Sequence, residues 1–230
     1  MKRRASVVAC AVAAAGIALP AQPAKPVPTK PRGRLFAVQD LGLLEAPDRD
    51  QWQKPDQIMD VLGIADGSFV ADLGAGSGWF TLRLARRVGP NGLVYSEDIQ
   101  PQMIEAIQQR LRGESLQNVR PVLGTPSDPR LPPGLDAALI VDAYHEMDDP
   151  ADPSLIVTLL GNVARALKPQ GRLGVVDFVP GGGGPGPEPD RRVKPEAVIK
   201  AAAAAGLQFA WREDVPPFLF LLVFGKAVGR

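Results

Sequence analysis

The chain is poor in the residues on which several classes of site depend. Its 230 residues contain one cysteine and one histidine, and only 6% are aromatic. The lone cysteine, Cys10, allows no internal disulfide. One histidine, with no cysteine nearby and no second ligand at helical spacing, argues against a metal site. The formal net charge of +1 shows no excess of basic residues, so we expect no nucleic-acid partner.

The apolar stretch at residues 5–19 is too short to span a membrane comfortably. It follows the basic residues Lys2, Arg3 and Arg4 and precedes small residues near position 21. This order predicts a secretory signal peptide over residues 1–21, and therefore an exported protein, on the periplasmic side if the segment is cleaved. Two alternatives stay open. One is an uncleaved anchor that touches the membrane through this segment alone, and the other is a start codon further downstream, which would make the protein cytoplasmic.

Proline-rich and glycine-rich segments indicate where the folded domain begins and where it contains a loop. Five prolines between residues 20 and 31 predict an extended linker over residues 22–33, so that the folded domain comprises residues 34–230. This length suits one α/β core. Within the domain, residues 180–189 are almost entirely glycine and proline, and they predict a mobile loop without helix or strand.

Strand and helix patterns alternate along the domain. Apolar runs predict seven strands, and helical patterns separate most of them. The expected strands cover residues 69–73, 92–97, 119–123, 136–141, 171–178, 207–212 and 218–224, and the expected helices cover residues 55–62, 78–88, 101–112, 154–167 and 197–205. This order predicts a doubly wound α/β fold with a mostly parallel sheet, helices on both faces, and an antiparallel last strand after the turn at Pro216 and Pro217.

The stretch from Phe69 to Phe80 carries the clearest chemical information. A buried strand continues through Asp72, and Gly74, Gly76 and Gly78 follow before a helix begins. Glycine at the first two positions allows a sharp bend and lets a ligand lie against the backbone, while Gly78 lets the helix pack close to the strand. The helix N-terminus favours a carboxylate, and Asp72 can accept hydrogen bonds from an ammonium group. A ligand with both groups at one end fits this turn.

The spacing Asp-x-Gly-x-Gly-x-Gly resembles the first motif of the class I S-adenosylmethionine-dependent methyltransferases. It differs from the dinucleotide fingerprint, in which two residues separate the second and third glycines. The resemblance covers roughly residues 52–226 and implies a seven-stranded, Rossmann-like sheet. It also implies S-adenosylmethionine as the cofactor, bound by Asp72 and by the turn residues Gly74, Ala75, Gly76 and Gly78. An ordinary strand, turn and helix of another α/β protein is the alternative for the glycines alone.

The second expected strand, residues 92–97, leads into two adjacent acids. In the family pattern an acid at the tip of this strand binds the ribose hydroxyls, and Asp98, followed by Ile99, is the better match. We therefore expect Asp98 and Ile99 to contact the cofactor, with Glu97 as the alternative acid. Both acids would otherwise only cap the helix that begins near Pro101.

After the third strand the chain departs from the family pattern. An acid there commonly meets the adenine amino group, but the matching position holds Thr125, and the acid present is Asp128. We expect Asp128 to contact the cofactor, although a role as a turn former or helix cap fits it equally.

The fourth strand is followed by Asp142, Tyr144, His145 and Glu146. The family places residues between donor and acceptor here. We expect His145 to act as a general base near neutral pH, Tyr144 to form part of the acceptor wall, and Asp142 to hold the methionine end of the cofactor. A structural hydrogen bond is the alternative for His145.

Two tryptophans lie near the starts of expected helices. Trp52 and Gln53 precede the first expected helix, where the family often folds a lid over the cofactor, and Trp79 begins the helix after the glycine turn. Packing in the core is the alternative for both tryptophans.

Two further strings, Asp-x-Tyr-His-Glu and Leu-Lys-Pro-x-Gly-Arg-Leu, are similar to the small-molecule branch of the family, which includes quinone-biosynthesis and arsenite methyltransferases. Arsenite methylation requires several thiolates, which this chain lacks. The resemblance therefore implies S-adenosylmethionine-dependent methyl transfer to an O, N or C nucleophile of a small molecule. One alternative is a non-catalytic exported nucleotide-binding protein, because S-adenosylmethionine is a cytosolic metabolite. An NAD-dependent oxidoreductase is a further alternative, which the turn spacing opposes.

Overall fold

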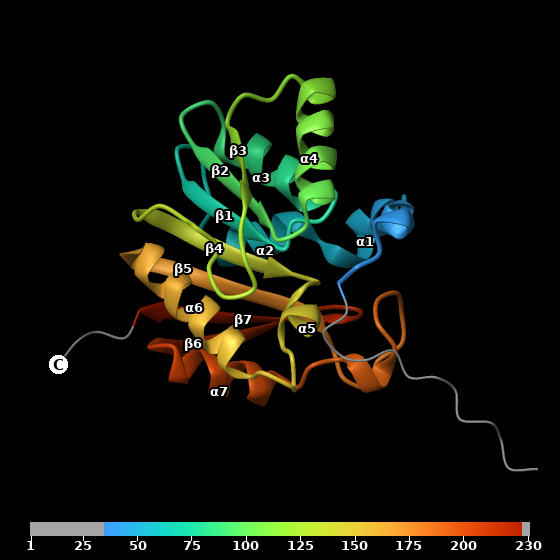
Figure 1. Ribbon diagram of the computed structural model, residues 1–230, viewed down its shortest axis with the longest axis vertical. Helices are drawn as coiled ribbons and strands as arrows, with labels where there is room; N and C mark the ends of the chain where they lie inside the picture. Colours follow the sequence, from blue (N-terminus) through green and yellow to red (C-terminus); the bar gives the residue numbers. More distant parts are fainter. Residues whose placement is uncertain (1–34, 227–230) are drawn as a thin grey trace, which may run out of the picture. The chain divides into compact units, whose positions relative to one another are not determined.

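Short apolar runs form the strands of one seven-stranded sheet in the computed structural model, which describes residues 35–226 (Figure 1). The strands are β1 (Phe69–Leu73), β2 (Leu93–Asp98), β3 (Val119–Leu123), β4 (Leu135–Val141), β5 (Leu167–Phe178), β6 (Leu207–Val215) and β7 (Leu219–Lys226). Their order is β3-β2-β1-β4-β5-β7-β6. The first five strands pair in parallel, and β7 pairs antiparallel with both β5 and β6. The predicted fold class is confirmed.

Helices cover both faces of the sheet and bury two apolar clusters against it (Figure 1). Residues of α1 (Arg49–Gln53), α2 (Pro55–Val61), α3 (Trp79–Val88) and α4 (Pro101–Glu114) contribute to one cluster. Residues of α5 (Tyr144–Met147), α6 (Ser154–Ala166) and α7 (Pro195–Ala204) contribute to the other. Two short 3₁₀ helices, η1 (Val38–Glu45) and η2 (Pro189–Arg191), complete the described elements. Successive strand residues point to opposite faces, which is why Val70 joins the first cluster and Ala71 the second.

Two features differ from the sequence prediction for identifiable reasons. Helix α2 begins at Pro55 as expected, but a further short helix, α1, precedes it, and the two are separated at Lys54, which has a positive φ of 47°. Pro55 causes the break, because a residue that precedes proline is disfavoured in the α region. Strand β5 begins at Leu167 rather than at residue 171, because Leu167 already pairs with Leu135 before a register shift.

The segment rich in glycine and proline forms no helix or strand from residue 180 to residue 188, as predicted. It wraps around the buried side chain of Arg192, whose guanidinium donates hydrogen bonds to five backbone carbonyls. These carbonyls belong to Val179, Gly182, Gly183, Pro185 and Pro187. The loop therefore has its own internal support, and its mobility stays a prediction.

The predicted signal peptide, residues 1–21, and the predicted linker, residues 22–33, lie outside the described residues. Across residues 35–226, no helix is both long enough and apolar enough to span a bilayer.

Candidate functional site

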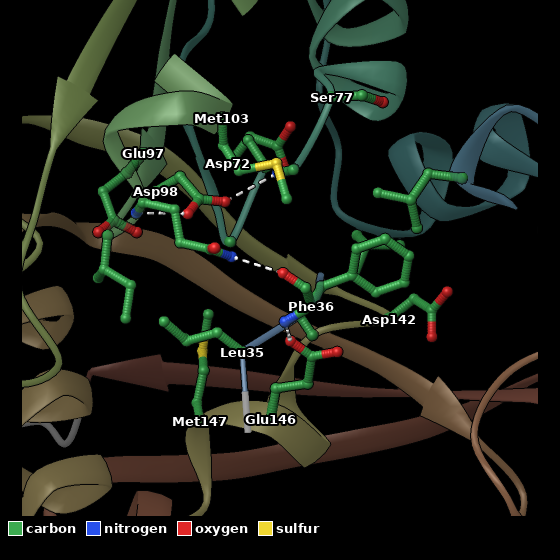
Figure 2. A pocket seen from close by; sticks show the side chains of 18 of the residues that line it. Leu35, Phe36, Asp72, Ser77, Glu97, Asp98, Met103, Asp142, Glu146 and Met147 are labelled. Atoms are coloured by element: carbon green, nitrogen blue, oxygen red, sulfur yellow. Dashed lines mark hydrogen bonds between the residues drawn. The ribbon is translucent and has the colours of Figure 1, made fainter. Parts of the chain in front are cut away.

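A cavity of about 300 Å³ lies where β1, β2, β3 and β4 end at the same edge of the sheet (Figure 2). Parallel sheets place ligands at this edge, because the loops that follow neighbouring strands converge there. The lining combines the glycine turn, the ends of the four strands, and a segment from the N-terminal side of the described chain. Of the residues predicted to form the site, the cavity is lined by Asp72, Gly74, Ala75, Gly76, Asp98, Ile99 and Asp142.

The glycine turn bends as expected and leaves no room for side chains. Gly74 and Gly76 have positive φ angles of 66° and 56°. A Cβ atom on Gly74 would lie 2.7 Å from Cε of Met147, and one on Gly76 would lie 3.1 Å from Cδ1 of Leu44. These positions therefore need glycine both for the backbone conformation and for the close approach of neighbouring residues.

Gly78 has a different role from the one predicted. It precedes the first residue of α3 with φ 81° and does not line the cavity. A Cβ atom there would lie 3.2 Å from Cγ1 of Ile107 in α4. Its lack of a side chain therefore allows α3 to begin close to α4, rather than close to the strand.

Asp98 lies at the end of β2, where the ribose acid was expected. Its Oδ2 accepts a hydrogen bond of 3.0 Å from the backbone N–H of Gly76, and its Oδ1 accepts one of 2.9 Å from that of Gln100. Burial raises the pKa of Asp98, and these backbone bonds oppose the rise. The carboxyl group is thereby fixed beside the glycine turn and faces the cavity together with Ile99.

Asp72 is buried under the turn and belongs to a polar cluster between β1, β2 and α3. The hydroxyl of Thr81 donates to Oδ2 of Asp72 over 2.6 Å and lies 2.7 Å from the hydroxyl of Ser96. Burial raises the pKa of Asp72 to about 6. Asp72 therefore holds α3 against the sheet and also faces the cavity.

The expectations for Tyr144 and His145 require correction, because neither side chain lines the cavity. Tyr144 is 1% exposed and lies within the apolar cluster under α6 and α7. Helix α5 instead turns Glu146 and Met147 toward the cavity, together with the preceding Ala143. The sequence identified the correct loop but assigned the wrong face of its helix.

His145 is held by Asp177 of β5. Its backbone N–H donates to Oδ2 of Asp177 over 3.1 Å, and its Nδ1 lies 3.1 Å from the same oxygen. Burial alone would lower the pKa of His145, but the hydrogen bond and charge of Asp177 raise it to about 9. The imidazole is therefore protonated at neutral pH, which contradicts the predicted role as a general base.

Two carboxyl groups that could bind a metal ion lie near His145, contrary to expectation. The cluster contains one potential ligand atom from each of Asp142, His145 and Asp177, and these three atoms lie within 4.8 Å of one another. Because His145 is protonated and paired with Asp177, we interpret this cluster as a buried charge network.

Asp142 follows β4 and has a positive φ of 56°, which turns it out of the strand direction. It lines the cavity, and its Oδ2 lies 4.0 Å from Nη2 of Arg49. Burial raises the pKa of Asp142 to about 7, and the positive charges of His145 and Arg49 limit the rise. The carboxyl group therefore titrates near neutral pH and faces the cavity.

Arg49 was not singled out from the sequence, and it supplies the cavity's positive charge. It is the one lysine or arginine among the described lining residues. Its side chain is 7% exposed, donates to the carbonyl oxygen of Leu44 over 2.6 Å, and stacks 4.4 Å from the ring centroid of Trp79. No sequence motif marked Arg49, because its importance arises from tertiary contacts alone.

The lid is formed by residues other than those predicted. Trp52 and Gln53 do not line the cavity, and Trp52 packs in the core with its ring 5.8 Å from that of Phe178. The segment from Leu35 to Glu45 covers the cavity instead, through Leu35, Phe36 and Leu44.

Two polar side chains hold the backbone of this segment. Glu146 accepts a hydrogen bond of 3.0 Å from the N–H of Phe36, and Gln100 donates one of 3.2 Å to the carbonyl of Phe36. Figure 2 shows Phe36 above Glu146, with Leu35 beside them.

The prediction that Asp128 contacts the cofactor is also wrong, because its side chain does not line the cavity. Thr125 and Pro126 line the cavity, and Asp128 does not. Asp128 closes a turn instead, because its N–H bonds to Oγ1 of Thr125 and its Oδ1 accepts from the N–H of Arg130. The alternative of a turn former describes Asp128 correctly.

Glu97, named only as an alternative acid, is the least satisfied group of the cavity. It is 2% exposed, and its Oε1 has no hydrogen-bond partner among the described residues. Burial and the nearby charge of Asp98 raise the pKa of Glu97 to about 8. The side chain is therefore a neutral carboxylic acid at neutral pH.

Comparison with known proteins agrees with this geometry. Residues 70–171 match the family model of a methyltransferase domain. Demethylmenaquinone methyltransferase of Lactobacillus johnsonii is 28% identical over 153 residues, which are 61% of this chain and 60% of that protein. A fibrillarin-like rRNA/tRNA 2'-O-methyltransferase of Pyrobaculum aerophilum is 31% identical over 120 residues, which are 49% of this chain and 46% of that protein. The chain thus spans about half the length of the curated relatives it matches.

The fold is also similar to that of a known methyltransferase. The crystal structure of a SAM-dependent methyltransferase from Aquifex aeolicus superposes with a TM-score of 0.75 at 23% identity, covering 82% of this chain and 98% of that chain. The match of residues 70–171 and the order of the strands show that the chain contains a region similar to a methyltransferase domain and has the fold of the Aquifex aeolicus protein.

Proposed function

We propose that the chain binds S-adenosylmethionine and transfers its methyl group to an O, N or C nucleophile of a small molecule. The observation that carries this proposal is the excess of acidic residues in the lining of the cavity. Six carboxyl groups line it against the one guanidinium of Arg49, and they belong to Asp72, Glu97, Asp98, Asp142, Glu146 and Asp149. Buried carboxyl groups favour a ligand that brings positive charge. S-adenosylmethionine carries a sulfonium and an ammonium group, whereas the pyrophosphate of NAD would meet these acids unfavourably.

The lining residues are suited to the separate parts of this cofactor. Asp98 beside the glycine turn can accept hydrogen bonds from ribose hydroxyls. Arg49 can pair with the carboxylate of the methionine end, while Asp72 and Asp142 can accept from its ammonium group. Gly74 and Gly76 line the cavity without side chains, so a ligand can lie against the backbone of the turn. When bound, the cofactor supplies a methyl group activated by the sulfonium charge.

Two carboxyl groups replace His145 as candidate proton acceptors. Asp142, with its pKa raised to about 7, can remove a proton from an O or N nucleophile near neutral pH. Glu146 also faces the cavity, and burial raises its pKa. We place Asp142 nearer to the methionine end, because Arg49 pairs with it.

A small acceptor is supported by the cover over the cavity. Leu35, Phe36 and Leu44 close one side with apolar side chains and carry no positive charge that would attract a polyanion. The relative from Lactobacillus johnsonii is named for demethylmenaquinone, a small molecule, whereas that from Pyrobaculum aerophilum is named for RNA. The acid-rich lining favours the first kind of acceptor for this chain.

The alternative is a non-catalytic binding protein with the same cavity. The sequence analysis expected His145 and Tyr144 to face the acceptor, and neither side chain lines the cavity. We propose that Asp142 and Glu146, which do line it, provide the proton acceptors of an enzyme. Export through residues 1–21 also remains our proposal, which the N-terminal mass of protein purified from cell fractions tests.

Calorimetric titration of the full chain with S-adenosylmethionine, S-adenosylhomocysteine and NAD tests the proposed cofactor. We expect micromolar binding of the first two and none of NAD. Because a cationic ligand lowers the pKa of the buried acids, we also expect proton release when S-adenosylmethionine binds, measured in buffers of different ionisation enthalpy. Failure of both adenosyl ligands to bind would contradict the proposal. Binding with no methyl transfer to any of a panel of quinols, phenols and amines would favour the non-catalytic alternative.

A further inference from the structure

We propose that Glu97 recognises the amino edge of the cofactor's adenine ring, in place of the acid that this chain lacks after β3. The proposal rests on the proposed function, because it concerns the same cavity. Three observations carry it: the missing acid, the unpartnered oxygen of Glu97, and the position of that oxygen beside the loop where the acid would stand.

The first observation is the composition of the loop after β3. Thr125 stands where the family pattern has an acid, and it lines the cavity. The nearby Asp128 is committed to a turn with Thr125 and Arg130. The loop therefore offers no carboxyl group to the cavity, although it forms part of the cavity wall.

The second observation is the side chain of Glu97 itself. Its Oε1 is buried and lacks a hydrogen-bond partner among the described residues, while the backbone N–H of Gly74 bonds to the same carboxyl group. A buried oxygen without a hydrogen-bond partner is unfavourable, so a ligand group that donates to Oε1 would remove this cost. Figure 2 shows Glu97 and Asp98 side by side at the cavity.

The third observation places Glu97 against the loop. A Cβ atom on Gly124 would come within 1.9 Å of Oε1 of Glu97, so glycine at this position makes room for the carboxyl group. Gly124 directly precedes Thr125. The carboxyl group of Glu97 thus occupies the space beside the position that the missing acid would hold.

The protonation state of Glu97 suits adenine. The surrounding titratable groups are all acids, namely Asp98 on the same strand, Asp72 on β1 and Asp128 in the loop after β3. Together with burial, they keep Glu97 neutral at neutral pH. A neutral carboxyl group has one donor and one acceptor, which match N1 and the amino group of adenine as an amide side chain would. An ionised carboxylate would accept from the amino group but repel N1.

Glu97→Gln and Glu97→Leu test the proposal through the dissociation constant of S-adenosylhomocysteine, measured by calorimetry on the full chain. Glutamine retains a donor and an acceptor, so we expect affinity within about threefold of the parent. Leucine retains neither, so we expect affinity to fall by about 10- to 100-fold. Asp128→Asn is the matched control and should leave affinity unchanged.

The pH dependence distinguishes recognition from a structural role. In the parent, the affinity for S-adenosylhomocysteine should be highest below pH 8 and should fall as the pH rises further, because Glu97 ionises. In Glu97→Gln the decrease in affinity that the ionisation of Glu97 causes should be absent. A fall of equal size in the parent and in Glu97→Gln would overturn the proposal, and this comparison holds even if Glu97→Leu does not fold.

The 1-deaza analogue of S-adenosylhomocysteine separates adenine recognition from a ribose contact. It lacks N1 and keeps the ribose. We expect the parent to bind it about tenfold more weakly than S-adenosylhomocysteine, and Glu97→Leu to bind both alike. An undiminished preference in Glu97→Leu would overturn the assignment to adenine. If the parent binds no adenosyl ligand, the proposed function itself fails; if it binds and Glu97→Leu binds equally well, this inference alone fails.

Discussion

We expect the substitution of Asp98 to weaken the binding of S-adenosylmethionine. Asp98→Ala removes the carboxyl group that would hold the ribose hydroxyls and that also fixes the N–H groups of Gly76 and Gln100. We expect the dissociation constant of S-adenosylmethionine to rise by about 10- to 100-fold, measured by calorimetry. Asp56→Ala, a substitution at an exposed acid, is the control. Equal affinity in Asp98→Ala and the parent would show that the ribose lies elsewhere.

His145 should matter for stability rather than for proton transfer. His145→Ala would leave Asp177 buried without its charged partner. Removing one member of a buried pair costs about 3 kcal/mol in the free energy of unfolding, which urea denaturation measures. Affinity for S-adenosylmethionine should stay within a fewfold of the parent in the folded fraction. A loss of turnover with unchanged stability would restore His145 as a catalytic residue.

At the scale of elements, the lid is tied to the domain by one ion pair. Glu45, at the end of η1, pairs with Arg110 of α4, and the hydroxyl of Ser77 donates to the same carboxylate. Glu45→Gln keeps the size of the side chain and removes its charge, so the lid should open more readily. We expect the dissociation rate of S-adenosylmethionine to rise about two- to fivefold, followed by stopped-flow tryptophan fluorescence.

Glu114→Gln provides the matched control for the lid. Glu114 is the last residue of α4 and pairs with the exposed Arg86 of α3, so the variant removes an ion pair that does not touch the lid. A similar rise in the dissociation rate in this control would show that charge loss alone, and not opening of the lid, causes the effect.

The elements that were predicted well from the sequence are those whose conformation depends on residues close to one another in the chain. The strand that contains Asp72, the turn at Gly74 and Gly76, and the helix that follows are defined by neighbours in sequence. Apolar periodicity likewise predicted the remaining strands to within a few residues. The start of α2 at Pro55 was predicted, whereas the short helix α1 before it was missed, because its five residues are too few to show a helical period.

The parts of the site that were missed depend on tertiary contacts. Helix α5 has only four residues, too few for periodicity to show that Glu146, and not Tyr144, faces the cavity. Arg49 reaches the cavity because α1 packs beside Trp79, which no local pattern indicates. Glu97 was recognised as an acid at the correct strand end, but its missing hydrogen-bond partner is visible only in three dimensions.

At the scale of the whole molecule, four buried groups bind protons more tightly in the folded state than their ordinary values imply. Burial raises the pKa of Asp72 to about 6, of Asp142 to about 7 and of Glu97 to about 8. Burial would lower the pKa of His145, but Asp177 raises it to about 9. Unfolding therefore releases protons between about pH 4 and pH 9.

The sign of the resulting pH dependence is the same for all four groups. Each acid destabilises the fold as the pH rises from its unfolded pKa toward its folded one. The contribution of His145 is full below about pH 6.5 and is lost as the pH rises through 9. We therefore expect the free energy of unfolding to fall by several kcal/mol between pH 5 and pH 8, at about 1.4 kcal/mol per group and pH unit, measured by urea denaturation of the ligand-free chain. Glu97→Gln should show a shallower fall, because it removes one of the four groups. A free energy of unfolding that rises over this range would contradict the assignment of buried neutral acids to the cavity.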